Sequence, residues 1–78
     1  MLAREILRLL HLSDPYAVKE TTLLAEVRQA LGTVGDGEFR AALQRIQTAG
    51  YAIADLEPLT DDRRWQLTPA GRSATKGR

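Results

Sequence analysis

The sequence predicts a small α+β domain that is mostly helical, in which three helices are followed by a C-terminal two-stranded β-hairpin. Apolar residues recur at helical spacing in three stretches of residues 2–49. The pattern then changes to short alternating stretches within residues 51–67, which is typical of strands. The length of 78 residues suits a single core, since domains usually contain about 50 to 250 residues.

The composition is that of an ordinary folded domain, because 44% of the residues are hydrophobic and 27% are charged. The absence of cysteine excludes disulfides, thiolate metal sites and cysteine nucleophiles. His11, the only histidine, cannot form a zinc site alone, so no metal and no cofactor are expected. No apolar run approaches the ~20 residues of a membrane span, and no secretory signal begins the sequence. We therefore expect a cytoplasmic domain with no membrane partner.

The first helix is expected over residues 2–12, where one apolar stripe lies between charged positions. The stripe consists of Leu2, Ile6, Leu9 and Leu10. Pro15 disfavours helical geometry in the residue before it and supplies no amide hydrogen, so the helix ends at residues 13–15. Residues 16–19 are expected to form an extended connector, at most a strand of two or three residues.

The second and third helices are separated by a glycine-rich turn. Thr21 or Thr22 is expected to cap the second helix, which ends at Gly32. Asp36 is the expected N-cap of the third helix, which runs to about Ala49. The predicted apolar positions of these two helices are Leu23, Leu24, Val27, Leu31, Phe39, Ala42, Leu43 and Ile46.

A β-hairpin is expected after the third helix. Residues 51–56 and 64–67 form its strands, and residues 57–62 form a polar turn that contains a proline. Trp65 and Leu67 alternate with polar residues, so both are expected to face inward.

A last short turn is expected after the hairpin, with Thr68 as its cap and Pro69 at its first position. Gly71 and the polar residues that follow it predict that this turn ends quickly. We accordingly divide the chain into one domain, residues 1–75, and a polar basic tail, residues 76–78.

Two segments resemble the winged helix-turn-helix superfamily, in the form found in bacterial regulators. Residues 39–51, FRAALQRIQTAGY, are similar to a recognition helix that runs into the first strand of the wing. Residues 65–72, WQLTPAGR, are similar to the strand-to-helix ending of such regulators. The resemblance covers residues 2–75 and identifies no single family. It implies a three-helix winged-helix fold, with the third helix in the DNA major groove and the hairpin, or wing, on the neighbouring backbone.

The outward face of the third helix, residues 38–49, suits DNA recognition. Arginine and glutamine form bidentate hydrogen bonds to guanine and adenine edges, and the small Ala41 allows close approach. No acidic residue follows Glu38 on this face. A solvated helix surface accounts for the same pattern, since both residue types are common there. The candidate contact residues are Arg40, Ala41, Gln44, Arg45, Gln47 and Thr48.

The wing is less suited to DNA, because carboxylates there would repel phosphates and oppose the dominant electrostatic term in affinity. These acidic residues are Asp55, Glu57, Asp61 and Asp62. Arg63 and Arg64 are candidate wing contacts to the DNA backbone. Alternatively, both arginines neutralise Asp61 and Asp62 across the hairpin, and the sequence leaves these alternatives open.

The remaining polar and aromatic residues have structural explanations. His11 at a helix C-terminus can simply interact with the helix dipole, and Trp65 is expected in the core rather than as an exposed stacking platform. No serine–histidine–acid arrangement or carboxylate pair has a plausible cleft, so we do not expect an enzyme.

Three hypotheses follow for function. The first is a DNA-binding module in transcriptional regulation that binds double-stranded DNA. A single small module contacts a short site, so this hypothesis implies dimerisation or fusion to another domain. The second is an interaction module without DNA binding, which uses the acidic wing or the third-helix face to bind another protein. The third is a structural domain of a longer chain. The net charge of only +1 favours the second hypothesis and also the third, whereas the arginine and glutamine face of the third helix favours the first.

Overall fold

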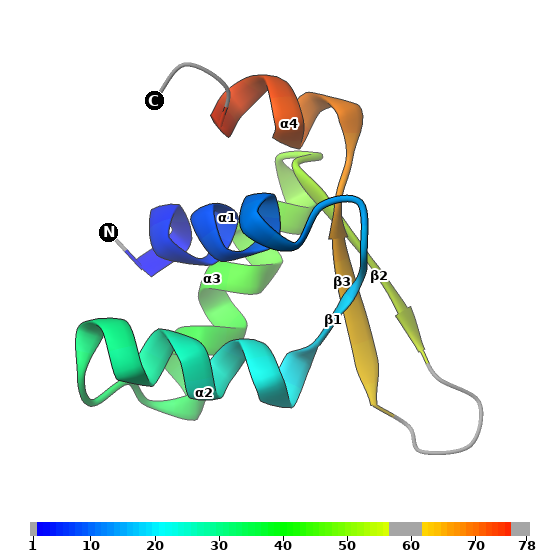
Figure 1. The fold of residues 1–78 in the computed structure, drawn as a ribbon. Helices are drawn as coiled ribbons and strands as arrows, with labels where there is room; N and C mark the ends of the chain where they lie inside the picture. Colours follow the sequence, from blue (N-terminus) through cyan, green and yellow to red (C-terminus); the bar gives the residue numbers. More distant parts are fainter. Residues whose placement is uncertain (1, 57–61, 76–78) are drawn as a thin grey trace.

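The computed structural model describes residues 2–56 and 62–75, which form four helices and one three-stranded antiparallel sheet (Figure 1). The predicted mostly helical α+β class is confirmed, whereas the predicted count of three helices and two strands is wrong. Most of the expected turn 57–62, with Glu57 and Asp61, and the expected tail 76–78 lie outside the described residues.

Helices α1 (Leu2–Ser13), α2 (Glu20–Leu31) and α3 (Asp36–Thr48) lie where the apolar spacing predicts them. The predicted cap of α2 at Thr21 or Thr22 is wrong, because the helix begins at Glu20 and Lys19 precedes it without a side-chain capping bond. The extended backbone of Lys19 belongs to a strand, so the change to helical geometry occurs directly after it. The positive φ of 85° at Gly32 agrees with its expected role in ending α2.

The predicted N-cap of α3 is also displaced, because Gly35 occupies this position and Asp36 is already helical. Arg28 explains the difference. Its Nη2 donates to Asp36 Oδ1 at 2.8 Å, and its Nε donates to the Val34 carbonyl at 3.0 Å. The Asp36 carboxylate therefore binds the end of α2 instead of capping α3, and this one arginine connects the two helices through the turn.

The sheet consists of β1 (Val18–Lys19), β2 (Ala52–Leu56) and β3 (Arg63–Leu67), in the order β1-β3-β2. β3 is antiparallel to both neighbours, with Trp65 opposite Val18 on one side and Ala54 on the other. The connector expected to be at most a short strand therefore supplies a third strand. It does so because β3 has a second row of backbone hydrogen-bonding groups beyond the hairpin.

The expected last short turn is the seven-residue helix α4 (Pro69–Thr75), which continues past Gly71 into the polar residues that were expected to end it. Thr68 caps it as predicted, since its Oγ1 accepts the Gly71 N–H at 3.0 Å. Gly71 permits close packing instead of terminating the helix, because a Cβ at this position would lie 2.0 Å from the Tyr51 carbonyl oxygen. Arg72 Nε donates to Asp14 at 2.9 and 3.0 Å, which joins α4 to the end of α1.

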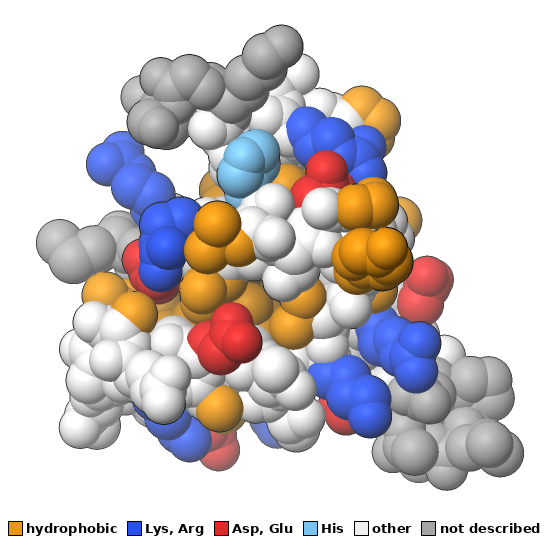
Figure 2. Space-filling model, in the orientation of Figure 1, with side chains coloured by type: hydrophobic (Ala, Val, Ile, Leu, Met, Phe, Trp, Pro, Cys, Tyr) orange, Lys and Arg blue, Asp and Glu red, His pale blue; other side chains and the backbone are white. Residues whose placement is uncertain are grey.

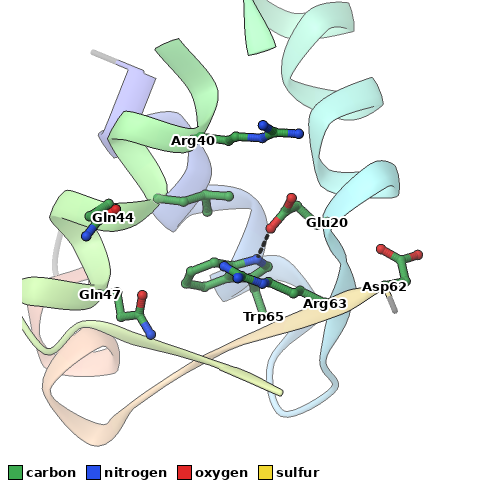
Figure 3. Close-up of a pocket in the computed structure, with 8 residues that line it drawn as sticks. Glu20, Arg40, Gln44, Gln47, Asp62, Arg63 and Trp65 are labelled. Atoms are coloured by element: carbon green, nitrogen blue, oxygen red, sulfur yellow. Dashed lines mark hydrogen bonds between the residues drawn. The ribbon is translucent and has the colours of Figure 1, made fainter. Parts of the chain in front are cut away.

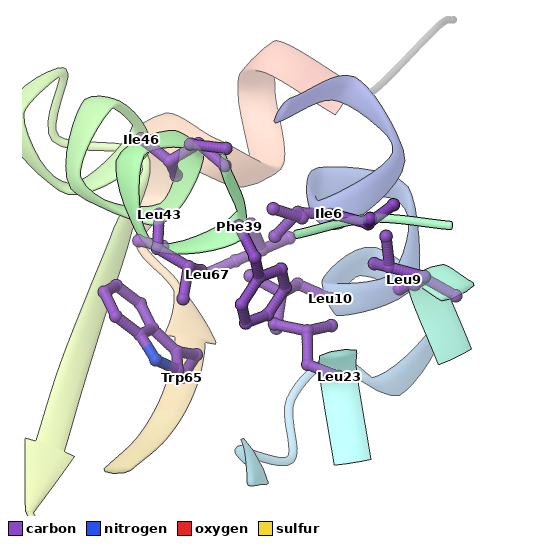
Figure 4. Close-up of a cluster of buried hydrophobic side chains, with 13 residues drawn as sticks. Ile6, Leu9, Leu10, Leu23, Phe39, Leu43, Ile46, Trp65 and Leu67 are labelled. Carbon is purple, nitrogen blue, oxygen red and sulfur yellow. The ribbon is translucent and has the colours of Figure 1, made fainter. Parts of the chain in front are cut away.

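The core lies between the three N-terminal helices and one face of the sheet (Figure 4). Trp65 and Leu67 face inward as predicted, and the Trp65 side chain is 1% exposed. The predicted buried stripe of α3 is confirmed in full, whereas Leu31, the last residue of α2, is exposed. The buried residues are Ile6, Leu9, Leu10, Leu23, Val27, Val34, Phe39, Ala42, Leu43, Ile46, Ala52, Trp65 and Leu67.

The face of the molecule formed by α1 and α2 carries mixed side chains (Figure 2). Hydrophobic groups gather between these two helices, with basic and acidic groups around them. None of the helices in the described part of the chain is long and apolar enough to span a membrane.

Candidate nucleic-acid interface

All six candidate contact residues of α3 are exposed, as predicted. Successive helical residues are rotated by about 100°, so the six do not share one direction. Ala41, Gln44 and Thr48 lie on the crest, directly opposite the buried stripe. The other three lie on the flanks, with Arg40 and Gln47 on one side and Arg45 on the other. The predicted contact face of α3 therefore consists of a crest and two flanks that carry different residues.

The flank of α3 that carries Arg40 and Gln47 borders a pocket of about 340 Å³ between α3, the start of α2 and β3 (Figure 3). Arg40 extends from α3 toward α2, above the position where Glu20 reaches toward the Trp65 ring (Figure 3). The pocket combines side chains from three separate parts of the sequence. Its lining residues are Glu20, Arg40, Leu43, Gln44, Gln47, Asp62, Arg63 and Trp65.

The two candidate wing arginines lie on opposite faces of β3, because side chains alternate along a strand. Arg63 shares the face of Trp65 and lines the pocket, whereas Arg64 lies on the other face. Arg64 stands directly opposite Asp55 of β2 and Lys19 of β1. The sequence analysis gives both arginines the same candidate role, whereas the structure places them on opposite faces of the sheet.

Glu20 is a residue of the site that the sequence reading missed. Its Oε1 accepts a hydrogen bond from Trp65 Nε1 at 2.9 Å, and both residues line the pocket. A glutamate at the start of a helix is an ordinary feature, and 45 positions separate it from Trp65. No signal in the sequence relates the two residues.

Asp62 also lines the pocket, and its Oδ2 accepts a hydrogen bond from Thr21 Oγ1 at 3.4 Å. Among the described residues, two arginines and two carboxylates line the pocket, Arg40 and Arg63 with Glu20 and Asp62. The crest of α3 beside it carries amide, hydroxyl and methyl groups. The site is suited to hydrogen bonding, and it is not a uniformly basic surface.

Two perturbed ionisable pairs lie on α1 and α4, away from the pocket. A hydrogen bond from Arg8 lowers the pKa of the Glu5 carboxyl, and the same hydrogen bond to Glu5 raises the pKa of the Arg8 guanidinium. The hydrogen bond to Asp14 likewise raises the pKa of Arg72. His11 Nδ1 lies 3.0 Å from Thr75 Oγ1, so this histidine also contacts α4.

Neither residues 2–56 nor residues 62–75 contain a cluster of three or more acidic or histidine side chains that could hold a metal ion. Comparison with protein-family models, with curated proteins and with solved structures finds no match. The function is therefore argued from the residues and geometry of this chain.

Proposed function

We propose that the chain is a winged-helix DNA-binding module that acts in transcriptional regulation. In this proposal the crest of α3 enters the major groove, and the β2–β3 hairpin is the wing beside the DNA backbone. The order of α2, α3 and the hairpin agrees with the winged-helix resemblance of residues 2–75. The major groove is wide enough to admit an α-helix, and α3 exposes its whole outer side.

One observation carries this proposal: Arg63 of the hairpin lines the same pocket as Arg40, Gln44 and Gln47 of α3. Helix and hairpin therefore present donor side chains to the same side of the molecule. Glutamine and arginine on α3 supply the groups that distinguish adenine and guanine, while Arg63 is placed to neutralise a phosphate nearby. If the outer side of α3 were only a solvated surface, there would be no reason for donor side chains of the hairpin to lie beside those of the helix.

Fluorescence anisotropy with random duplex DNA at two salt concentrations tests the proposal. We expect binding at ~50 mM salt that weakens as salt rises, because phosphate contacts release counterions. Arg40→Ala and Arg45→Ala should each weaken binding by about 1–3 kcal/mol where the arginine contacts a base. Arg4→Ala on α1 removes the same charge away from α3 and is the matched control. No detectable binding at ~100 μM protein in low salt contradicts the proposal.

A second candidate, a protein-binding module without DNA binding, is favoured by Glu20 and Asp62 in the pocket. These carboxylates would repel a phosphate, yet they would accept hydrogen bonds from a basic protein segment. Asp62→Asn distinguishes the two candidates. This change should tighten DNA binding if Asp62 lies near the backbone, whereas a protein-binding module should fail to bind DNA with either residue.

A further inference from the structure

The two edges of the sheet differ in how well they are protected against pairing with another strand. An edge strand exposes unpaired backbone groups, and proteins protect such edges by making them short or by placing lysine or proline on them. β1 has only two residues, and one of them is Lys19. β2 has five residues, Ala52–Leu56, with no lysine or proline. Within residues 2–56 and 62–75, β3 is the only strand that pairs with β2.

The backbone pattern shows which groups of β2 point away from the sheet. The Thr68 N–H donates to the Tyr51 carbonyl at 3.0 Å, so residues 51 and 68 form a hydrogen-bonded pair of the β2–β3 ladder. Hydrogen-bonded and non-hydrogen-bonded pairs alternate in an antiparallel ladder. The backbone groups of residues 51, 53 and 55 therefore point toward β3, and those of Ala52, Ala54 and Leu56 point outward.

The side chains of β2 are unusually apolar for an exposed edge. Ile53 is 51% exposed and Leu56 is 58% exposed, whereas Asp55 is the only charged residue of the strand. Ile53 lies on the sheet face opposite the core, together with Asp55 and Arg64. A long apolar edge of this kind is favourable for pairing with another strand.

We propose that β2 pairs with β2 of a second copy of this chain, antiparallel and with Ile53 opposite its own counterpart. The triplet Ala52-Ile53-Ala54 is its own reverse, so it is complementary to itself in this register. Each Asp55 then faces the phenol of Tyr51 in the other copy, and the two carboxylates stay apart. Moving the register by two residues in each strand places Asp55 opposite Asp55, which is unfavourable because like charges repel.

The backbone directions support the same register. The two Ile53 residues, one from each copy, form a non-hydrogen-bonded pair. The outward backbone groups of Ala52 and Ala54 form the hydrogen bonds between the copies. The result is a continuous six-stranded sheet with a two-fold axis perpendicular to it. Such an axis leaves both α3 helices on the same side of the sheet. The interface rests on the strand edge alone, so it requires no DNA binding.

The first experiment measures the association state of the full chain without DNA, by sedimentation velocity from about 10 μM to about 1 mM protein, where weak interfaces associate. We expect a reversible monomer–dimer equilibrium. Ile53→Lys should shift it to monomer, because two lysines would oppose each other across the axis. Leu12→Lys on α1, where the native leucine is also exposed, at 68%, should leave the dimer unchanged. A wild-type chain that is monomeric throughout, or a dimer that survives Ile53→Lys, overturns the proposal.

The register is tested by cross-linking, since the chain contains no cysteine of its own. Opposed Cα atoms of a non-hydrogen-bonded pair lie about 4.5 Å apart, within the range that a disulfide spans. Ile53→Cys should therefore form a covalent dimer under mild oxidation. Asp55→Cys is the matched control on the same face, because its two copies would lie about 13 Å apart along the strands. Equal cross-linking of the two variants, or cross-linking of Asp55→Cys alone, contradicts the proposed pairing.

Discussion

The two faces of the sheet have opposite roles, although the residues that form them alternate in the sequence. On the face toward α3, Ala52, Trp65 and Leu67 are each at most 3% exposed. On the other face, Ile53 is 51% exposed and Arg64 stands in a cross-strand row with Asp55 and Lys19. Because successive strand residues point in opposite directions, one face contributes to the core and the pocket while the other carries surface charge.

This difference has a direct consequence for the substitutions that matter. Arg63, Arg64 and Trp65 are consecutive, yet the first lines the pocket, the second faces solvent and the third is buried. The following predictions test this division of roles, beginning with the largest expected effect.

Trp65→Ala should destabilise the protein by about 3–5 kcal/mol, because it removes the largest side chain of the core and leaves a cavity. Ile53→Ala, on the opposite face, should change the free energy of unfolding by about 0.5 kcal/mol or less. Equilibrium urea unfolding at low protein concentration measures both values. Similar losses in the free energy of unfolding for the two variants would show that both faces of the sheet contribute equally to stability.

Gly71→Ala should destabilise by about 1–3 kcal/mol or more, because its Cβ would collide with the Tyr51 carbonyl oxygen and the Leu67 side chain. Gly37→Ala is the matched control, since a Cβ there meets nothing within 4 Å. Alanine also favours the helix, so this control should be neutral or slightly stabilising. Thermal unfolding of the two variants distinguishes close packing of α4 from a general intolerance of alanine.

Glu20→Ala should cost about 1–3 kcal/mol, because the buried indole N–H of Trp65 loses its acceptor. Glu20→Gln keeps a side-chain oxygen at the same position and should cost less. Urea unfolding, followed by the fluorescence of Trp65, reports both the stability and the environment of the ring. If Glu20→Gln destabilises as much as Glu20→Ala, the negative charge of this residue matters more than its hydrogen bond.

If Arg63 contacts a phosphate, Arg63→Ala should make the negative slope of log affinity against log salt less steep by about 0.9. Arg64→Ala removes the same charge from the opposite face and should leave the slope nearly unchanged. Anisotropy titrations on random duplex DNA across a salt series measure both. Equal changes in the slope for the two variants would indicate that each arginine contributes only its charge, whichever face of the sheet it lies on.

The sequence predicts best what depends on local periodicity. The buried stripe of α3 and the inward positions Trp65 and Leu67 follow from helical and strand spacing alone. Elements that depend on a distant partner were predicted less well. β1 exists as a strand because β3 pairs with it, and α4 continues past Gly71 because that glycine packs against Tyr51.

The candidate site shows the same limit. Helical spacing correctly identifies the exposed residues of α3, but it does not indicate which flank faces the hairpin. Glu20 and Trp65 both line the pocket and form a hydrogen bond with each other, and only the folded chain brings these two residues together. Arg28 similarly displaces the expected cap of α3, because its side chain reaches Asp36 eight positions away.

The central position of β3 also bears on how the molecule folds. Its neighbours are β1, from near the start of the chain, and β2, which directly precedes it in the hairpin. The contact with β1 requires closing a loop of more than 40 residues before its hydrogen bonds form, and such non-local contacts slow folding relative to a purely helical bundle of this size. During synthesis, residues 2–48 cannot complete their core until Trp65 and Leu67 emerge. The N-terminal helices therefore depend on the last quarter of the chain to form one cooperative unit.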